Sequence, residues 1–279
     1  MERPLGLMCG AGVLPARMAD EARRRGWRVV AFTFDGAPGV AEGAESAEGA
    51  VRAETVVPSR IAELGAVLAR LQRERISSVL FSGRFSMPDV LRIGAVADTT
   101  FRSFEAQARS RSGAPFVDAI ITTLGGLGVE VLDQRDFVGD WLVGAGCWSA
   151  RTPTDAEWRD ARSGLKAARL VASARIGQTV VVRHGAVVAV EAVEGTTEAV
   201  RRGAALGGPG TVVVKAVAPD HDYRFDAPAV GPETFAAAAE GGVAVVAMEA
   251  ARVLLFDRPE TLRIADAAGI AVIGVDDPP

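Results

Sequence analysis

Cysteine, long apolar runs and excess positive charge are all scarce in this sequence. Its two cysteines, Cys9 and Cys147, form no disulfide framework, which favours a reducing compartment. Apolar runs such as residues 243–248 are far shorter than the roughly 20 residues that cross a bilayer, so contact with lipid has to be peripheral. The N-terminus lacks the charged, apolar and cleavable segments of a signal peptide. The sequence therefore predicts a cytoplasmic globular protein.

Charge and aromatic content also argue against a nucleic-acid partner. The 31 basic and 35 acidic residues give a net charge of −4, which supplies no overall positive field for a phosphate backbone. Only 6% of the residues are aromatic, so few rings are available to stack on bases. Two arginine clusters, at 23–25 and 70–75, fall at predicted helix C-termini, where cations stabilise the helix dipole. Their alternative role is peripheral contact with the inner face of the cytoplasmic membrane.

The 279 residues, 49% of them apolar, are enough for two domains of ordinary size. The first half alternates short β-branched runs with amphipathic helical stretches, which is typical of βαβ units and a parallel sheet. We predict an α/β protein with a Rossmann-like N-terminal domain at 1–133, a linker at 134–150 and a distinct mixed α/β C-terminal domain at 151–279. Within the second domain, His184-Gly185 separates two valine-rich runs and predicts a tight hairpin.

A glycine loop follows the first predicted strand. Gly10-Ala-Gly12 precedes a helix that begins near Leu14, where bare backbone N–H groups can approach a phosphate or a nucleotide. Asp35 ends the next strand, where a dinucleotide-binding fold has an acidic group for the ribose, but Pro15 replaces the third glycine of that fingerprint. Three interpretations stay open: a structural turn, a nucleotide-binding loop, and the NAD(P) site of an oxidoreductase.

Gly83-Arg84 follows the third predicted strand in the same way. It is a candidate second wall of a ligand-binding site, because ligands of such sheets bind at the carboxyl ends of the strands. The alternative is purely structural: Gly83 forms a turn and Pro88 opens the next helix.

The densest group of reactive side chains lies between a strand and a helix of the second half. Lys215, His221, Asp222, Arg224 and Asp226 all fall there. Carboxylates can hold Mg²⁺ through oxygen ligands while lysine and arginine neutralise phosphate oxygens. If the segment is extended, residues 222, 224 and 226 project to one side. The alternative is a solvated turn in which Asp222 and Arg224 merely pair.

Other chemistries fit the sequence less well. The two cysteines are far apart in sequence and His184 lies at a predicted hairpin tip, which disfavours zinc. There is no nucleophile elbow for a serine triad. Metal-assisted attack on phosphorus needs neither a cysteine–histidine zinc site nor a nucleophilic serine. Farther upstream, Glu191-Ala-Val-Glu194-Gly195-Thr196 ends a hairpin strand and opens a helix, as an N-cap or as a site for an anionic ligand.

Taken in order, several segments resemble the LpxI family of UDP-2,3-diacylglucosamine pyrophosphatases over nearly the whole chain. They are Gly6-Leu-Met-Cys-Gly10-Ala-Gly-Val-Leu-Pro15, Ile176-Gly-Gln178, Val190-Glu-Ala-Val-Glu194-Gly-Thr196, Lys215, and Arg224-Phe-Asp226-Ala-Pro228-Ala-Val-Gly231 with Thr234. The resemblance implies hydrolysis of UDP-2,3-diacylglucosamine to UMP and 2,3-diacylglucosamine 1-phosphate in lipid A synthesis, assisted by Mg²⁺, with Mn²⁺ as an alternative. The family's catalytic aspartate falls on Asp226.

We accordingly expect four catalytic residues, of which the two aspartates also hold the metal, and a larger substrate-binding set. The catalytic set is Asp226, Asp222, Lys215 and Arg224. The substrate-binding set is Gly10, Gly12, Leu14, Gly83, Arg84, Gln178, Glu194, Thr196, His221 and Thr234. The partner is then the UDP-linked, diacylated glucosamine, and because symmetric dimers are common we expect a homodimer.

The sequence departs from the family pattern at two positions. Thr197 stands where the family has aspartate, and His221 where it has glutamine. The loss of a carboxylate at Thr197 suggests a second alternative to the hydrolase, a noncatalytic relative that binds lipid or nucleotide. The first alternative is the NAD(P)-binding oxidoreductase built on Gly10 and Gly12.

Overall fold

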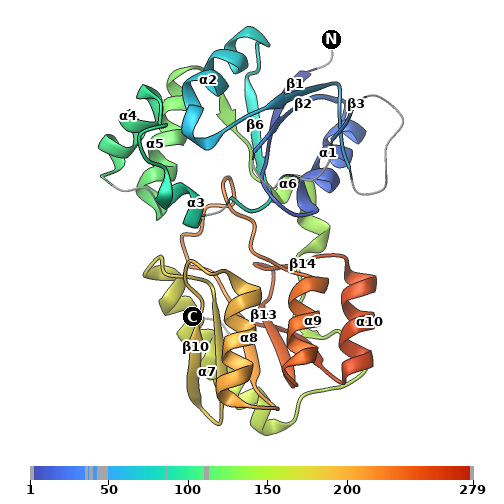
Figure 1. Cartoon of the computed structure of the whole chain (residues 1–279). Helices are drawn as coiled ribbons and strands as arrows, with labels where there is room; N and C mark the ends of the chain where they lie inside the picture. Colours follow the sequence, from blue (N-terminus) through green and yellow to red (C-terminus); the bar gives the residue numbers. More distant parts are fainter. Residues whose placement is uncertain are drawn as a thin grey trace. The chain divides into compact units, whose positions relative to one another are not determined.

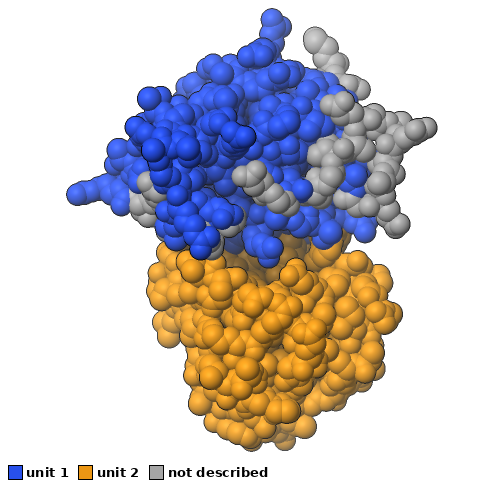
Figure 2. All heavy atoms as spheres, in the orientation of Figure 1, with its two compact units in different colours: residues 1–138, 222–227 blue, residues 139–221, 228–279 orange. Residues whose placement is uncertain are grey.

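The computed structural model describes residues 3–34, 37, 40–42, 50–85, 87–109 and 113–276. The chain forms two compact units, coloured separately in Figure 2. Unit 1 comprises residues 1–138 and Asp222–Ala227, and unit 2 comprises residues 139–221 and 228–279. The sequence predicts Asp222–Ala227 within the second domain, but in the structure this short segment packs with unit 1.

Unit 1 is built on a parallel sheet of the order β5-β2-β1-β6-β7. The strands are β1 (Arg3–Cys9), β2 (Trp27–Thr33), β5 (Thr55–Pro58), β6 (Ser78–Ser82) and β7 (Glu130–Val131), and a separate pair joins β3 (Val40–Glu42) to β4 (Val51–Ala53). Strands β1, β2 and β6 are largely buried because apolar side chains, aliphatic in β1 and also β-branched or aromatic in β2 and β6, fill both faces of the sheet. The predicted Rossmann-like parallel sheet is confirmed.

Helices cover both faces of this sheet (Figure 1). The helices of unit 1 are α1 (Leu14–Arg24), η1 (Ile61–Glu63), α2 (Leu64–Arg73), α3 (Met87–Arg92), α4 (Thr99–Ala108), α5 (Gly113–Gly126) and α6 (Arg135–Val138). Leu71 of α2 and Leu124 of α5 share a core cluster with Met8 and Phe32 of the sheet. Helix α1 buries Met18 and Ala22 and lies on the other face. The carboxyl ends of β1 and β6 thus open onto loops held between two helical layers.

Unit 2 contains a mixed sheet of the order β10-β9-β11-β13-β15-β8. Its strands are β8 (Gly146–Cys147), β9 (Thr179–Arg183), β10 (Ala186–Val190), β11 (Val212–Lys215), β13 (Val245–Glu249) and β15 (Ala271–Val275). Strands β11, β13 and β15 are parallel, whereas β9, β10 and β8 pair antiparallel to their neighbours. The mixed α/β second domain is therefore confirmed.

The predicted hairpin at His184-Gly185 is confirmed as the link between β9 and β10. Both residues have positive φ, 50° and 80°, as two-residue hairpin turns require. The two carboxylate oxygens of Asp160 accept hydrogen bonds from both turn amides. The sequence signal and the backbone geometry agree here because glycine relieves the strain of the turn.

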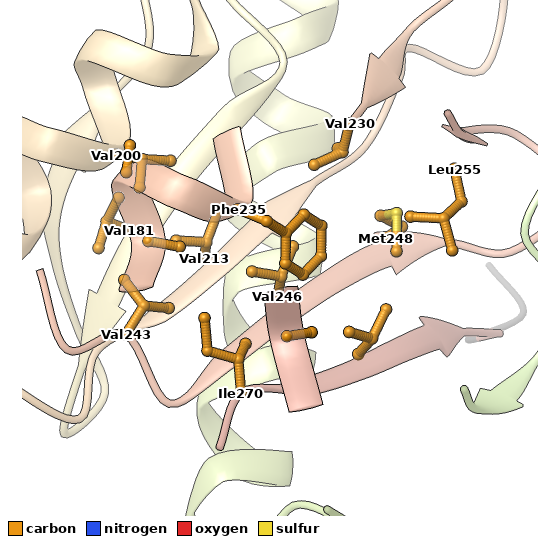
Figure 3. Close-up of a cluster of buried hydrophobic side chains, with 14 of the residues drawn as sticks. Val181, Val200, Val213, Val230, Phe235, Val243, Val246, Met248, Leu255 and Ile270 are labelled. Carbon is orange, nitrogen blue, oxygen red and sulfur yellow. The ribbon is translucent and has the colours of Figure 1, made fainter. Parts of the chain in front are cut away.

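Helices pack on both faces of the unit 2 sheet. They are η2 (Gly139–Trp141), α7 (Asp155–Ser173), α8 (Thr196–Gly207), α9 (Pro232–Glu240) and α10 (Arg258–Ala268), and a small parallel pair joins β12 (Ala229–Val230) to β14 (Leu254–Leu255). A capping box of Thr154 and Glu157 begins α7. Leu165 of α7 packs in one core cluster, and Phe235 of α9 lies at the centre of the other, shown in Figure 3.

Candidate functional site

The two glycine loops of unit 1 meet at the carboxyl ends of β1 and β6. The amide of Ala11 donates to the carbonyl oxygen of Arg84, and the amide of Arg84 donates to the carbonyl oxygen of Ala11, each at 2.8 Å. A Cβ on Gly10 would lie 2.7 Å from the Arg84 oxygen, and a Cβ on Gly83 would lie 2.7 Å from the Ala11 oxygen. Because only glycine allows this approach, the structure explains both residues by backbone contact and brings two predicted ligand loops together.

This bridge lies at the beginning of α1. Helix α1 begins at Leu14 without an acidic residue in its first turn and without a side-chain cap, so its own sequence leaves the positive end of the helix dipole without a neutralising charge. Gly12, just before it, has a φ of 95°. The side chain of Arg84 is exposed, and within the described part of the chain it has no ion-pair partner. The loops therefore present a cation and helix amides on one edge of unit 1.

A short segment from the second half of the chain completes this edge. We call residues 222–227 the Asp226 arm. The Phe225 ring lies 5.1 Å from the Phe81 ring and 6.3 Å from the Phe85 ring, measured between centroids. Phe85 in turn lies 5.5 Å from Phe34. Aromatic pairs at such distances are stabilising beyond the area they bury, so the arm is attached to the core of unit 1 at the carboxyl ends of its strands.

Tyr223 provides a second attachment for the Asp226 arm. Its side chain is 4% exposed, and its carbonyl oxygen accepts a hydrogen bond of 3.1 Å from the amide of Gln134. The guanidinium carbon of Arg135 lies 4.1 Å from the centre of the tyrosine ring, within the range of a cation–π contact. Residues 223 and 225 therefore face inward, whereas Arg224 and Asp226 are exposed.

The outward side of the arm carries a paired arginine and aspartate. The Nε and Nη2 atoms of Arg224 donate to the two carboxylate oxygens of Asp222 at 3.0 and 2.7 Å. These hydrogen bonds raise the pKa of Arg224 above its usual value. The pairing is the one that the solvated-turn interpretation predicts, and it engages both oxygens of Asp222, which the sequence names as a metal ligand.

A similar pair lies beside the arm. Arg135 donates to both carboxylate oxygens of Asp133, at 2.6 Å for the shortest bond. Burial would raise the pKa of Asp133, but hydrogen bonds and charge from Arg135 outweigh burial and hold the pKa below its usual value. Asp222 acts in the opposite direction by charge repulsion. Asp133 and Asp222 are thus near neighbours, each neutralised by its own arginine.

These carboxylates do not form a ready-made metal centre. Among the residues that the structure describes, no three histidine, cysteine, aspartate or glutamate side chains come together in a group that could hold a metal. Mg²⁺ is commonly held by one or two carboxylates together with substrate phosphates and water. Of the two predicted ligands, Asp226 has an exposed side chain, and both carboxylate oxygens of Asp222 accept hydrogen bonds from Arg224.

Unit 2 has its own polar cluster at the carboxyl end of β11. The Nζ atom of Lys215 donates to Thr196 at 2.8 Å and to Thr179 at 3.4 Å, and it lies 3.6 Å from a carboxylate oxygen of Glu191. Thr196 donates its own hydroxyl proton to Glu191 at 2.9 Å. Lys215 is 3% exposed and Glu191 is 8% exposed. Lys215 thus has two hydroxyl acceptors and one carboxylate countercharge, and it supports Thr196 at the start of α8.

The environment of Glu191 keeps it ionised despite its burial. Burial alone would raise its pKa, but the charge of Lys215 and hydrogen bonds from Thr179, Thr196 and the Gln178 amide together hold the pKa below its usual value. The backbone of Gly177 passes so close that a Cβ there would lie 2.1 Å from the Glu191 carbonyl oxygen. The buried pair is therefore built into the edge of the unit 2 sheet.

Sequence reasoning selects Glu194 here, and the structure places that residue differently. Glu194 is exposed and pairs with Arg202 at 2.6 Å, whereas Glu191 occupies the buried cluster. The signal that could have identified Glu191 is its place directly after Val190, the last residue of β10. A carboxylate at the end of a buried strand needs a partner. Lys215 can be that partner because it ends β11, which is separated from β10 in the sheet by β9.

The other predicted residues of the second half also belong to unit 2. The carbonyl oxygen of Gln178 accepts from the amide of Ala216 at 2.9 Å, and the amide of His221 donates to Ala218. The hydroxyl groups of Thr197 and Thr234 lie 3.1 Å apart. Thr197, the departure from the family pattern, thus has a hydroxyl partner in Thr234.

The fold and the polar groups at its strand ends define a two-unit α/β protein of the class that binds ligands at the carboxyl ends of parallel strands. More particularly, the chain belongs to the LpxI family. The sequence model of the LpxI N-terminal domain matches residues 4–141, and that of the LpxI C-terminal domain matches residues 144–273. The family predicted from the sequence motifs is confirmed.

A curated relative covers the same span. UDP-2,3-diacylglucosamine pyrophosphatase LpxI of Caulobacter vibrioides is 30% identical over 292 aligned residues, which include 98% of each protein.

Likenesses to solved structures are distant and support no assignment. Glycinamide-RNase-transformylase T from Mycobacterium tuberculosis is 16% identical over 68% of this chain and 44% of its own, with a TM-score of 0.23. CobK precorrin-6A reductase is 16% identical over 99% and 89%, with a TM-score of 0.32.

Proposed function

We propose that this protein hydrolyses the pyrophosphate bond of UDP-2,3-diacylglucosamine, giving 2,3-diacylglucosamine 1-phosphate and UMP in lipid A biosynthesis. The observation that carries the proposal is family membership along the whole chain, with a relative of that activity aligned over 98% of both proteins. Membership favours this reaction over an NAD(P)-dependent oxidoreductase. Asp35, on which the oxidoreductase also depends, lies outside the described residues.

Asp226 is the residue that we assign to the reaction itself. It is an exposed carboxylate on the Asp226 arm, at the same edge of unit 1 as the bridged glycine loops. In this proposal it orients the attacking water, while Arg224, held rigid by Asp222, offsets charge on the phosphoryl oxygens through its Nη1 group. Removing one such preorganised group costs about 2.7–4 kcal/mol of transition-state stabilisation, or a hundred- to thousandfold in rate.

A metal would enter this site with the diphosphate. Asp226 would supply one oxygen ligand to Mg²⁺, or to Mn²⁺, and the substrate phosphates would supply others. When bound, such a cation polarises the phosphoryl group. The role of Asp222 in this arrangement is to hold Arg224.

Substrate binding is assigned to the remaining predicted residues of each unit. In unit 1 these are the loops with Gly10, Gly12, Leu14, Gly83 and Arg84, where helix amides and a cation suit an anionic group. In unit 2 we assign Thr196, supported by Lys215 and Glu191, together with Gln178, His221 and Thr234. Glu194, paired with Arg202, is not needed for this assignment.

The reaction is tested by incubating the protein with UDP-2,3-diacylglucosamine and measuring UMP by mass spectrometry. We expect UMP release that stops with EDTA and returns with Mg²⁺ or Mn²⁺. Release that EDTA leaves unchanged would remove the metal from the proposal but keep the hydrolase. Binding of the substrate without any UMP identifies the noncatalytic relative instead. A fluorescence titration with NADH and NADPH covers the oxidoreductase, and we expect no binding there.

The cellular setting is also part of the proposal. In the described residues, no helix combines the length and the apolar character needed to cross a membrane. We propose a cytoplasmic homodimer that meets its lipid-bearing substrate by peripheral contact with the inner face of the cytoplasmic membrane. Analytical ultracentrifugation tests the dimer, and flotation with anionic vesicles tests the contact.

A further inference from the structure

We infer that Phe225 is a positioning residue for Asp226: it ties the Asp226 arm to the aromatic core of unit 1 and so fixes the carboxylate that acts in the reaction. The inference rests on the proposed function, because it concerns where that function's central residue is held. Phe225 lies within a segment that resembles the family, but no sequence motif assigns it a role.

The backbone of the arm has no regular structure of its own to hold Asp226. Residues 222–227 lie in no helix or strand, and the next strand, β12, begins at Ala229. Ordering each residue of such a segment costs backbone conformational entropy, which side-chain contacts have to offset. Asp226 itself is exposed, so burial of its own side chain does not supply this compensation. Contacts made by the neighbouring residues of the arm can supply it.

Phe225 is the neighbour that makes apolar contact with unit 1. It packs against the core cluster that includes Phe34, Phe81 and Leu71. The rings of Phe225 and Phe85 are nearly parallel, with an interplanar angle of 28°. Phe225 is partly buried there, and removing aromatic surface from water is stabilising, which helps to offset the cost of ordering the adjacent residue.

The stack also links Asp226 to the bridged loops. Phe85 follows Arg84 directly, and Arg84 is fixed by its paired backbone hydrogen bonds with Ala11. Through Phe225 and Phe85, the carboxylate of the arm and the guanidinium of the loop are thus attached to one rigid frame within unit 1. A reaction that depends on geometry is sensitive to such a frame, because a misplacement of about 1 Å can reduce the rate about 100-fold.

The test measures kcat and KM for UMP release by the full-length wild type and by Phe225→Ala, Phe225→Leu and Phe256→Ala. Phe256 is the matched control: it is a half-buried phenylalanine of unit 2 whose ring centroid lies 5.4 Å from that of Trp141. We expect F225A to lower kcat about 100-fold with KM changed less than about threefold. F225L, which keeps an apolar side chain, should recover to within about tenfold of wild type, and F256A should retain a kcat within about threefold.

A double variant separates positioning from general damage. If Phe225 acts through Asp226, adding F225A to Asp226→Asn should produce no further loss in single-turnover rate, because the carboxylate it positions is already gone. An equal additional loss in the double variant overturns the inference. So does an F225A kcat near wild type, or a loss that disappears when rates are corrected for the folded fraction. If the wild type itself releases no UMP, the proposed function fails first and the inference falls with it.

Discussion

The buried pair of Lys215 and Glu191 offers the sharpest test of how the unit 2 edge is built. Lys215→Met removes a 3%-exposed cation and leaves the carboxylate of Glu191 buried without its countercharge, 3.6 Å from where the ammonium was. Breaking a buried ion pair from one side typically costs 3–5 kcal/mol, since the remaining charge keeps its desolvation penalty. We expect K215M to lower the free energy of unfolding of unit 2 by about 4 kcal/mol.

The double variant Lys215→Met/Glu191→Gln removes the stranded charge. The single amide oxygen of the substituted side chain can still accept the hydrogen bond that Thr196 donates to one carboxylate oxygen of Glu191, so we expect about 2 kcal/mol of the loss to be recovered, a coupling in the usual range for contacting residues. The chain's other lysine, the exposed Lys166, provides a control, and K166M should change stability by less than about 0.5 kcal/mol.

Urea unfolding followed by tryptophan fluorescence is the appropriate assay. Trp141, Trp148 and Trp158 all belong to unit 2, whereas Trp27 belongs to unit 1, so the signal reports mainly the unit that contains the pair. A K215M variant within about 1 kcal/mol of wild type, or a double variant whose loss equals the sum of the two single losses, would refute the reasoning.

Three further predictions concern single groups. The pKa of Glu191 is lower in the folded state than its unfolded-state value of about 4.3. Its contribution to stability is therefore present above the unfolded-state pKa and is lost as the pH falls through the lower folded-state pKa. In urea unfolding, the difference in free energy of unfolding between wild type and Glu191→Gln should accordingly shrink below about pH 4. Gly83→Ala should destabilise unit 1 by about 1–3 kcal/mol in urea unfolding, since φ is 81° and the new Cβ would collide with the Ala11 carbonyl oxygen. An unchanged free energy of unfolding would show that the backbone bridge between Ala11 and Arg84 can move to accommodate the Cβ. Burial raises the pKa of the Cys9 thiol to about 12, whereas Cys147 is exposed. A thiol reagent at pH 8 should therefore label Cys147 alone in the native protein and both cysteines in urea, and rapid native labelling of Cys9 would contradict its burial.

Patterns along the chain predict the architecture because they are local. Short β-branched runs that alternate with amphipathic helices indicate the parallel sheet, and His184-Gly185 indicates the hairpin, since each depends on residues close in sequence. The order and spacing of the motifs also predict the family, which the domain matches confirm.

Long-range packing is what the sequence does not reveal. The alternation across the Asp226 arm predicts that Arg224 and Asp226 share a side, but no local rule indicates that Phe225 packs against Phe81 of the unit 1 sheet. The choice between Glu191 and Glu194 is similar. Both follow the same strand, and the register of β10 against β9 and of β9 against β11 decides which carboxylate is buried beside Lys215.

The central claim is that Asp226 directs hydrolysis of a diphosphate. It is tested most directly by comparing UMP release from UDP-2,3-diacylglucosamine by the wild type and by Asp226→Asn, with substrate binding measured in parallel. The account predicts that the variant binds substrate as the wild type does but releases UMP about a hundred- to thousandfold more slowly. A variant that keeps most of the wild-type rate would contradict it.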